Sequence, residues 1–288
     1  MVENTKKLLL SLLSVPILVL SQVIALGVGN VMVMVGIPTA AGNVAAGIIY
    51  AVTALSGLVF LCEKGLLISP KERGISRPSL KPVWGVSAFL MPLSVIIILN
   101  FAPGMPSGTW ISSWRSTSMP PASIVAVVTG AVCFFGFAAG IVEEAVFRGI
   151  IMTALERKWN KIVAILLPSM LFGLLHIIGN DLDFFSILQL FVAGTFVGIL
   201  FSLVTYESGN IWCSSFLHAV WNIFMGSGIL NIGTEVDSYS LFNYVIDSNS
   251  FLISGGDFGI DASIVSVFIY ILFSAFAFIL YRKNTARP

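Results

Sequence analysis

The sequence carries little charge. Asp, Glu, Lys and Arg make up 10% of its 288 residues, and the formal net charge is +1. Soluble domains hold roughly 25% charged residues, so this composition excludes an ordinary soluble fold, and it excludes a disordered chain as well. A net charge this small also excludes the basic surface of a nucleic-acid-binding protein. Hydrophobic residues make up 57% of the chain, and the mean hydropathy is +0.98. The composition therefore predicts a polytopic membrane protein with the lipid bilayer as its first partner.

Cysteine is also scarce. The chain has 3 cysteines, Cys62, Cys133 and Cys213, far apart and without CxxC spacing. This pattern predicts neither a disulfide framework nor a thiolate metal site. An HExxH motif is missing too, which excludes the usual helical zinc site of metallopeptidases.

Apolar runs long enough to cross a bilayer, which takes roughly 20 residues, recur along the whole chain. They predict about eight membrane helices at 8–29, 43–61, 83–101, 122–157, 162–179, 184–206, 211–228 and 263–281. The expected fold is all-α and polytopic. We divide it into three N-terminal helices (1–121), a central core (122–228), and an acidic outer loop with a last helix (229–288). The first run has no clear cleavage site, so we interpret it as an uncleaved helix.

The basic residues predict the orientation, because Lys and Arg concentrate in cytoplasmic loops. With the N-terminus inside, all of the 15 basic residues except Arg115 and Arg148 fall in cytoplasmic segments. The outer loops then collect the acids Asp181, Asp183, Glu235, Asp237, Asp247, Asp257 and Asp261. Both termini are therefore expected inside. The outer acids are expected to be solvated, and the loops 102–121 and 229–262 to be polar connections.

Ionisable groups inside apolar helices are expensive, about 2.5–3.5 kcal/mol each on insertion scales, and so indicate function. The chain has 2 histidines, His176 and His218, and both lie inside predicted spans. Glu143, Glu144 and Arg148 lie inside the fourth predicted span. At ~1.5 Å per residue from the inner ends of their helices, Glu143, His176 and His218 lie ~16–22 Å deep. A shared depth on three helices predicts a shared site.

Helical spacing suggests separate roles for these residues. Glu144 and Arg148 are four residues apart on one face and can pair, which offsets much of the cost of burying them. Adjacent helical residues point about 100° apart, so Glu143 and Glu144 are not expected to face one point. Glu144 is therefore the expected structural partner of Arg148, and Glu143 the free carboxylate. His218 and Asn222 share a face of the seventh span.

This set of residues suits the activation of water. A buried carboxylate can act as a general base near neutral pH, and a neighbouring histidine can orient the water or pass a proton to a leaving amine. His218 and Asn222 can donate hydrogen bonds to an oxyanion. Equally, Glu143, His176 and His218 can be three ligands of a catalytic zinc ion that leave one position for water. The residues alone leave both mechanisms open.

Three motifs occur in order on the fourth, fifth and seventh predicted helices. They are Glu143-Glu144-x-x-x-Arg148, Phe172-x-x-x-His176 and His218-x-x-x-Asn222. Over roughly 122–228 this set resembles the CAAX-processing and bacteriocin-processing intramembrane endopeptidases, which include the type II CAAX prenyl endopeptidases. The resemblance implies hydrolysis of a peptide bond in a membrane-associated protein or peptide, by a multi-pass protein of the plasma membrane. It also implies that Glu143 and His176 activate water while His218 and Asn222 form the oxyanion pocket.

Two other classes of function are compatible with the same residues. In a proton-coupled transporter, Glu143, His176 and His218 would form a proton relay, although no internal repeat supports this class. A non-catalytic membrane scaffold or immunity factor would keep the fold without turnover, and the intact motifs argue against it.

Overall fold

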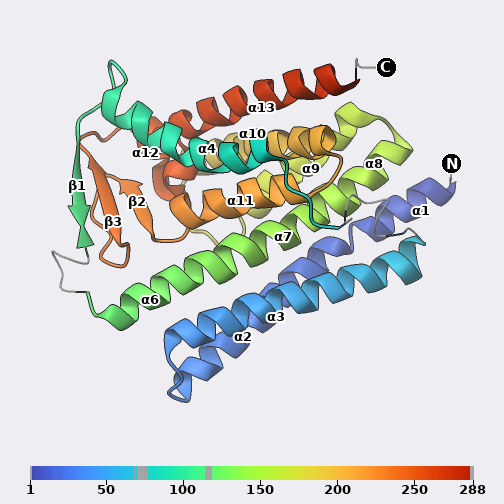
Figure 1. Ribbon diagram of the computed structural model, residues 1–288, viewed down its shortest axis with the longest axis horizontal. Coiled ribbons are helices and arrows are strands. Elements are labelled where there is room, and N and C mark those ends of the chain that lie inside the picture. Colours follow the sequence, from blue (N-terminus) through green and yellow to red (C-terminus); the bar gives the residue numbers. More distant parts are fainter. Residues whose placement is uncertain (1, 68, 70–74, 76, 114–118, 286–288) are drawn as a thin grey trace.

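The computed structural model describes residues 2–67, 69, 75, 77–113 and 119–285. These residues form a bundle of long helices with a small sheet at one end (Figure 1). Both chain ends lie at the end of the bundle opposite the sheet. Four basic residues of the charge count, Lys71, Arg73, Arg115 and Arg287, lie outside the described residues.

Six helical stretches of the described chain are long and apolar enough to cross a membrane, which confirms a multi-pass membrane protein. The first, Asn4–Met34, contains parts of α1 (Val2–Ser11) and α2 (Ser14–Met34), and the second, Thr39–Leu66, contains α3 (Thr39–Phe60) and a π-helical turn, Leu61–Leu66. The others are α4 (Pro82–Phe101), Pro121–Lys158, α10 (Phe184–Ser208) and α13 (Ile264–Thr285). A helix satisfies its backbone polar groups internally, as hydrocarbon requires.

The stretch Pro121–Lys158 is one long helix, as predicted, but its winding is not uniform. It runs through α6 (Pro121–Thr129), a π-helical segment (Gly130–Ala138), α7 (Ala139–Glu144), a second π-helical segment (Ala145–Ile151) and α8 (Met152–Lys158). The two wider segments flank the six residues of α7, which end in the glutamate pair. Such π-helical insertions are frequent at functional sites.

Two helices are shorter than predicted. α9 (Lys161–Leu175) has 15 residues and α11 (Trp212–Met225) has 14, lengths of ~21–23 Å against a hydrocarbon core of ~30 Å. Both lie where spans were expected, so six of the eight expected helices have spanning length and the count of eight stays a prediction. α9 ends early because the backbone hydrogen bonds after Leu175 span three residues instead of four, from Ile177 N to Leu174 O and from Ile178 N to Leu175 O. A left-handed turn at Gly179 (φ 86°) follows.

A three-stranded sheet departs from the all-α expectation. It pairs β1 (Gly108–Ser112) antiparallel to β3 (Phe242–Ile246), and β3 parallel to β2 (Leu230–Gly233). These strands come from the two outer loops that were expected to be polar connections, so that expectation is wrong for them. Runs of four or five residues are too short for a periodic pattern to separate them from loop. After β3, α12 (Phe251–Ser254) and 3-10 turns at Gly256–Phe258 and Ile260–Ala262 lead into α13.

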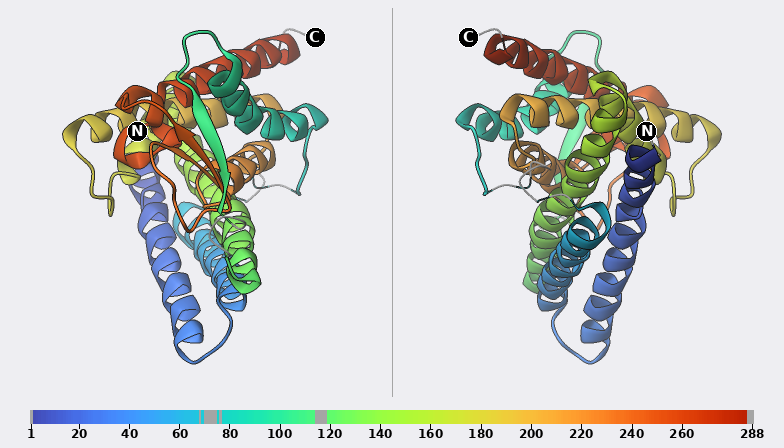
Figure 2. Two further views of the ribbon diagram at one scale, coloured as in Figure 1. Left: turned by 90° about the vertical axis from the view of Figure 1, so that its left-hand side faces the viewer. Right: turned by 90° about the vertical axis from the view of Figure 1, so that its right-hand side faces the viewer.

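The helices pack in two groups that meet along the long helix, where α7 and the π-helical segment before it contact α11 and α8 contacts α9. α2, α3 and the long helix run side by side, whereas α4, α9, α10, α11 and α13 form the second group (Figures 1 and 2). Glycines allow the closest approaches. A Cβ on Gly140 of α7 would lie 3.0 Å from Ala219 N of α11, and one on Gly194 of α10 would lie 2.6 Å from Gly173 Cα of α9. Backbone contact of this kind brings the three motif-bearing helices together.

Candidate active site

A cavity of about 480 Å³ is lined by residues of the long helix, α9, α10 and α11 and of the loop before α13. Five of the motif residues line it: Glu143, Phe172, His176, His218 and Asn222. Much of its wall is aromatic, from Phe134, Phe135, Phe172, Phe201, Trp221, Phe258 and Tyr270. Residues far apart in the chain therefore meet around one space, as their similar depths predicted.

Glu144 and Arg148 lie beside this cavity and form the predicted pair. Arg148 Nη1 lies 2.8 Å from Glu144 Oε1, and both side chains have 0% exposure. Arg148 Nη2 donates to the carbonyl of Gly198 at 3.0 Å. The rings of Phe147, Phe172 and Phe201 surround the guanidinium at 5.0–5.7 Å. Paired and surrounded by rings in this way, the two charges stabilise each other away from water.

His218 contacts both glutamates, which the sequence argument did not expect. Its Nδ1 lies 3.3 Å from Glu144 Oε1, and its Nε2 lies 3.7 Å from Glu143 Oε2. The ring stacks on Phe201 with centroids 4.8 Å apart. The two glutamates therefore meet the same ring, but at different nitrogens. An imidazole has two nitrogens on different edges, so carboxylates about 100° apart on α7 can each reach one of them.

Glu143 is the less satisfied of the two glutamates. Oε2 of each glutamate is buried without a hydrogen-bond partner among the described residues, but Glu144 Oε1 contacts Arg148 and His218, whereas the Glu143 carboxylate makes no hydrogen bond there. Tyr50 of α3 lies close enough for the charge of Glu143 to act on it, and its buried hydroxyl likewise lacks a partner in the described chain. Sequence reasoning missed Tyr50, because a single tyrosine in an apolar helix carries no pattern. Buried polar atoms without partners are rare and need an explanation.

His176 is held in one tautomer. Its Nδ1 lies 2.8 Å from the carbonyl oxygen of Phe172, and the two rings pack with centroids 4.4 Å apart. A carbonyl can only accept, so Nδ1 carries the proton, and Nε2 of the neutral ring is an acceptor. Within the described structure His176 makes no hydrogen bond to Glu143, and the two side chains share only the cavity wall.

Asn222 lies one helical turn after His218. Its Nδ2 donates to the carbonyl of Phe135 at 2.9 Å, within the first π-helical segment. This bond ties α11 to the long helix. An amide nitrogen has two hydrogens, so one donor of Asn222 stays available for another acceptor.

Asp261 was predicted to be a solvated outer residue, and this is wrong. The 3-10 turn Ile260–Ala262 brings it to the cavity wall, half-buried, where its Oδ1 accepts a hydrogen bond of 2.5 Å from Trp221 Nε1. Burial raises the pKa of Asp261 to about 6, against the opposite effects of the Trp221 bond and of the two histidines. The sequence offers no signal for this position, because Asp261 follows a glycine-rich polar loop and resembles the other outer acids.

The structure does not assemble the three expected zinc ligands into a preformed site. Among the described residues, no group of three or more His, Cys, Asp or Glu side chains is placed to hold a metal ion. Glu143, His176 and His218 line one cavity, and both nitrogens of His218 face glutamates. The mechanism proposed below uses these side chains without a metal.

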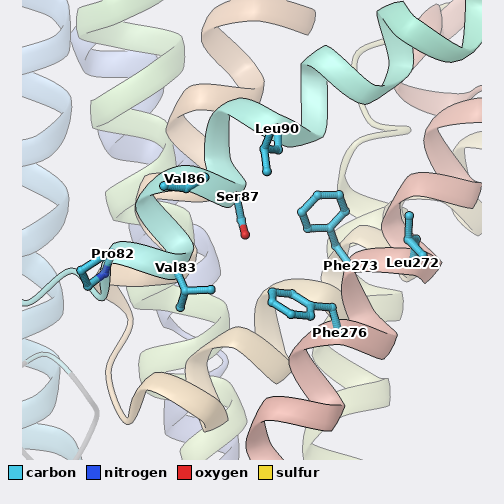
Figure 3. A pocket seen from close by; sticks show the side chains of 8 residues that line it. All are labelled: Pro82, Val83, Val86, Ser87, Leu90, Leu272, Phe273 and Phe276. Atoms are coloured by element: carbon cyan, nitrogen blue, oxygen red, sulfur yellow. The ribbon is translucent and has the colours of Figure 1, made fainter.

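A second cavity, of about 590 Å³, lies between α4 and α13 (Figure 3). It is lined by Pro82, Val83, Val86, Ser87, Leu90, Leu272, Phe273 and Phe276. Its lining contains no titratable side chain, so it offers no group for acid–base chemistry. The smaller cavity, in contrast, is lined by titratable side chains from several helices.

Comparison with known proteins identifies the segment that carries the site. Residues 121–224 match the family model described as Type II CAAX prenyl endopeptidase Rce1-like. The chain matches no curated protein and no solved structure. The matched residues include every position of the three motifs, so the resemblance drawn from those motifs is confirmed.

Proposed function

Residues 121–224 carry an Rce1-like domain of the CAAX protease family, which implies a membrane-embedded hydrolase, and from this premise we propose an intramembrane endopeptidase. Its substrate is a membrane-associated protein or peptide. One observation carries the proposal: Glu143, His176, His218 and Asn222, from three separate helical stretches, line a single cavity. Their chemical types are those that hydrolysis of an amide requires.

Glu143 is the proposed general base. It takes one proton from a water molecule while the water oxygen attacks the carbonyl carbon of the scissile bond. A new C–O bond forms, and the π-electron pair moves to the carbonyl oxygen. His176 accepts the second hydrogen bond of the water through Nε2, the acceptor nitrogen of the neutral tautomer that its bond to Phe172 selects. The oxyanion then collapses, the C–N bond breaks, and Glu143 returns the proton to the leaving nitrogen, so one water is consumed.

His218 and Asn222 are the proposed donors to the oxyanion. Asn222 has a second amide hydrogen beyond the one that Phe135 accepts. His218 Nδ1 faces the carboxylate of Glu144, so Nε2 can donate as well only when both ring nitrogens carry protons. The glutamates on either side stabilise that cation, and a cationic donor strengthens an oxyanion hole. In this scheme Glu144 and Arg148 act through His218 by fixing its position.

The proposal also includes the arrangement of the chain in the membrane. We place the protein in the plasma membrane with both termini in the cytoplasm, and count α9 and α11 as the two short members of a set of eight membrane helices. Residues 122–228 form the catalytic core, with three helices before it and an outer loop and last helix after it. The basic residues near the inner ends of the helices support this orientation.

Cleavage of a fluorescence-quenched peptide library by the purified protein tests the proposal. Wild type is compared with Glu143→Gln and His176→Ala, each with and without a zinc chelator. We expect Glu143→Gln to lose about 10²–10⁴-fold in rate, the usual contribution of a general base. His176→Ala is expected to lose less, and the chelator to change nothing.

The possible outcomes separate the alternatives. Loss of cleavage in both variants, with unchanged melting temperatures in detergent, supports the enzyme and its water-activating pair. Cleavage that survives both substitutions contradicts the proposal, because the activity then belongs to a contaminant. A non-catalytic scaffold or a proton-coupled transporter would then be the better interpretation. Loss of wild-type activity in chelator contradicts the metal-free mechanism alone.

A further inference from the structure

We propose that Asp261, which lines the same cavity as His176 and His218, is a positioning residue of this site whose carboxylate stabilises positive charge on the two histidines. The inference rests on the proposed function and extends it to a residue outside the matched segment 121–224. Its basis is the position of Asp261 on the cavity wall beside both histidines.

The fold holds Asp261 in place from three sides. Trp221 Nε1 donates to its Oδ1, and Tyr270 Oη donates to its backbone carbonyl at 3.1 Å. Ser266 Oγ donates to the preceding carbonyl, that of Ile260, at 2.6 Å. Trp221 adjoins Asn222 on α11, whereas Tyr270 and Ser266 belong to α13. The carboxylate is therefore anchored to a motif-bearing helix by one oxygen only.

The second oxygen of Asp261 is not used by the fold. No described residue donates a hydrogen bond to Oδ2. The titratable groups that share the cavity wall with it are Glu143 of α7, His176 after α9, His218 of α11 and Tyr270 of α13. Positive charge on either histidine lowers the pKa of the Asp261 carboxyl.

This placement complements the proposed chemistry. His218 must carry protons on both nitrogens to serve Glu144 and the oxyanion together, and His176 becomes more positive as it accepts a hydrogen bond from water. A carboxylate fixed nearby lowers the energy of both states. Because Asp261 acts through the histidines rather than on the substrate, its removal should change the rate of turnover more than substrate binding.

A structural role makes a different prediction. If Asp261 served only as the acceptor for Trp221, an asparagine would replace it without loss, since its side-chain carbonyl accepts the same bond. Asp261→Asn therefore removes the charge and keeps the acceptor. Asp257→Asn is the matched control, because Asp257 lies four residues earlier, outside the cavity lining, and accepts from the backbone of Asp183.

The first test needs no substrate. The chain has 2 histidines, so histidine labelled with ¹³C at Cε1 yields two NMR signals in detergent. We expect Asp261→Asn to shift the signals of both histidines. Asp257→Asn should leave both in place. Histidine signals that are unchanged in Asp261→Asn would overturn the inference, whether or not the protein cleaves any peptide.

The second test separates turnover from binding. On the library peptide that wild type cleaves fastest, we expect Asp261→Asn to lower kcat about tenfold or more with KM within twofold, and Asp261→Glu to recover part of the loss. A raised KM with unchanged kcat would contradict the inference and assign Asp261 to substrate binding. If wild type cleaves nothing, the proposed function fails and the NMR result still decides the role of Asp261.

Discussion

Two buried glutamates, Glu143 in the middle of the long helix and Glu207 in the last turn of α10, are held in opposite ways. Glu207 of α10, with its side chain 3% exposed, accepts from Trp84 Nε1 at 2.6 Å. Lys81 Nζ and Asn284 Nδ2 also donate to it, each at 2.8 Å. Glu143 has a buried Oε2 without a hydrogen-bond donor in the described chain, 3.7 Å from His218 Nε2.

The difference between them distinguishes a structural carboxylate from a chemical one. Glu207 joins α4, α10 and α13, and its donors offset the cost of removing its charge from water. Glu143 Oε2 has no donor, so the cost of removing its charge from water is not offset there. This is expected where a group must exchange protons with a substrate or water. A buried carboxylate is thus a candidate for function when neither of its oxygens has a donor, as in Glu143 but not in Glu144, and burial alone is not enough.

The largest effect is expected at Arg148, whose partner Glu144 is the immediate neighbour of Glu143. Arg148→Ala leaves the Glu144 carboxylate buried without its cation, and breaking a buried pair in this way costs about 3–5 kcal/mol. Glu143→Gln removes no hydrogen bond to Oε2 and should change stability little. Melting temperatures in detergent, read for both variants beside wild type, check this. Similar melting temperatures for the two variants would contradict the division of roles between the adjacent glutamates.

A smaller loss of stability is expected from substitution of the other glutamate, Glu207. Glu207→Gln retains one acceptor oxygen but loses the ion pair with Lys81, which is itself 36% exposed. We expect a loss of roughly 1–3 kcal/mol, because the partial exposure of Lys81 weakens the pair. The folded fraction of this variant should cleave at the wild-type rate, whereas Glu143→Gln should be stable and inactive. Equal losses of activity in the two variants would contradict the assignment of Glu207 as structural and Glu143 as catalytic.

The smallest effect concerns Asp261, a third buried carboxylate with one bonded oxygen. Its pKa of about 6 lies above the ordinary 3.8, so the folded state binds the proton more tightly than the unfolded state. The stabilising contribution is present below about pH 4 and is lost as the pH rises through 6. Two pKa units correspond to ~3 kcal/mol, which partial exposure reduces to roughly 1 kcal/mol.

Melting temperatures of wild type and Asp261→Asn between pH 4 and 7 measure this contribution. The variant should gain stability relative to wild type as the pH rises, because asparagine does not ionise. A constant difference across this range would show that the Asp261 carboxylate titrates normally.

The site follows from the sequence to a considerable degree. The spacing of Glu144 and Arg148 predicted their ion pair, and the depths of Glu143, His176 and His218 predicted that they meet. These features are local or periodic, and a helix converts sequence spacing directly into position. The early end of α9 at His176 was not predictable, since it depends on the bonds of one turn and on a left-handed glycine.

Composition and periodicity determined by themselves that this chain crosses a membrane and that its ionisable residues lie on particular helices. Hydrocarbon cannot satisfy free backbone groups, so long apolar runs must become helices. Only the tertiary structure decided which acidic groups are satisfied and which are not. The donors of Glu207 come from two other helices, and Asp261 reaches Trp221 across 40 residues of chain. No pattern along the sequence encodes such contacts, because they arise from packing between segments that are distant in the chain.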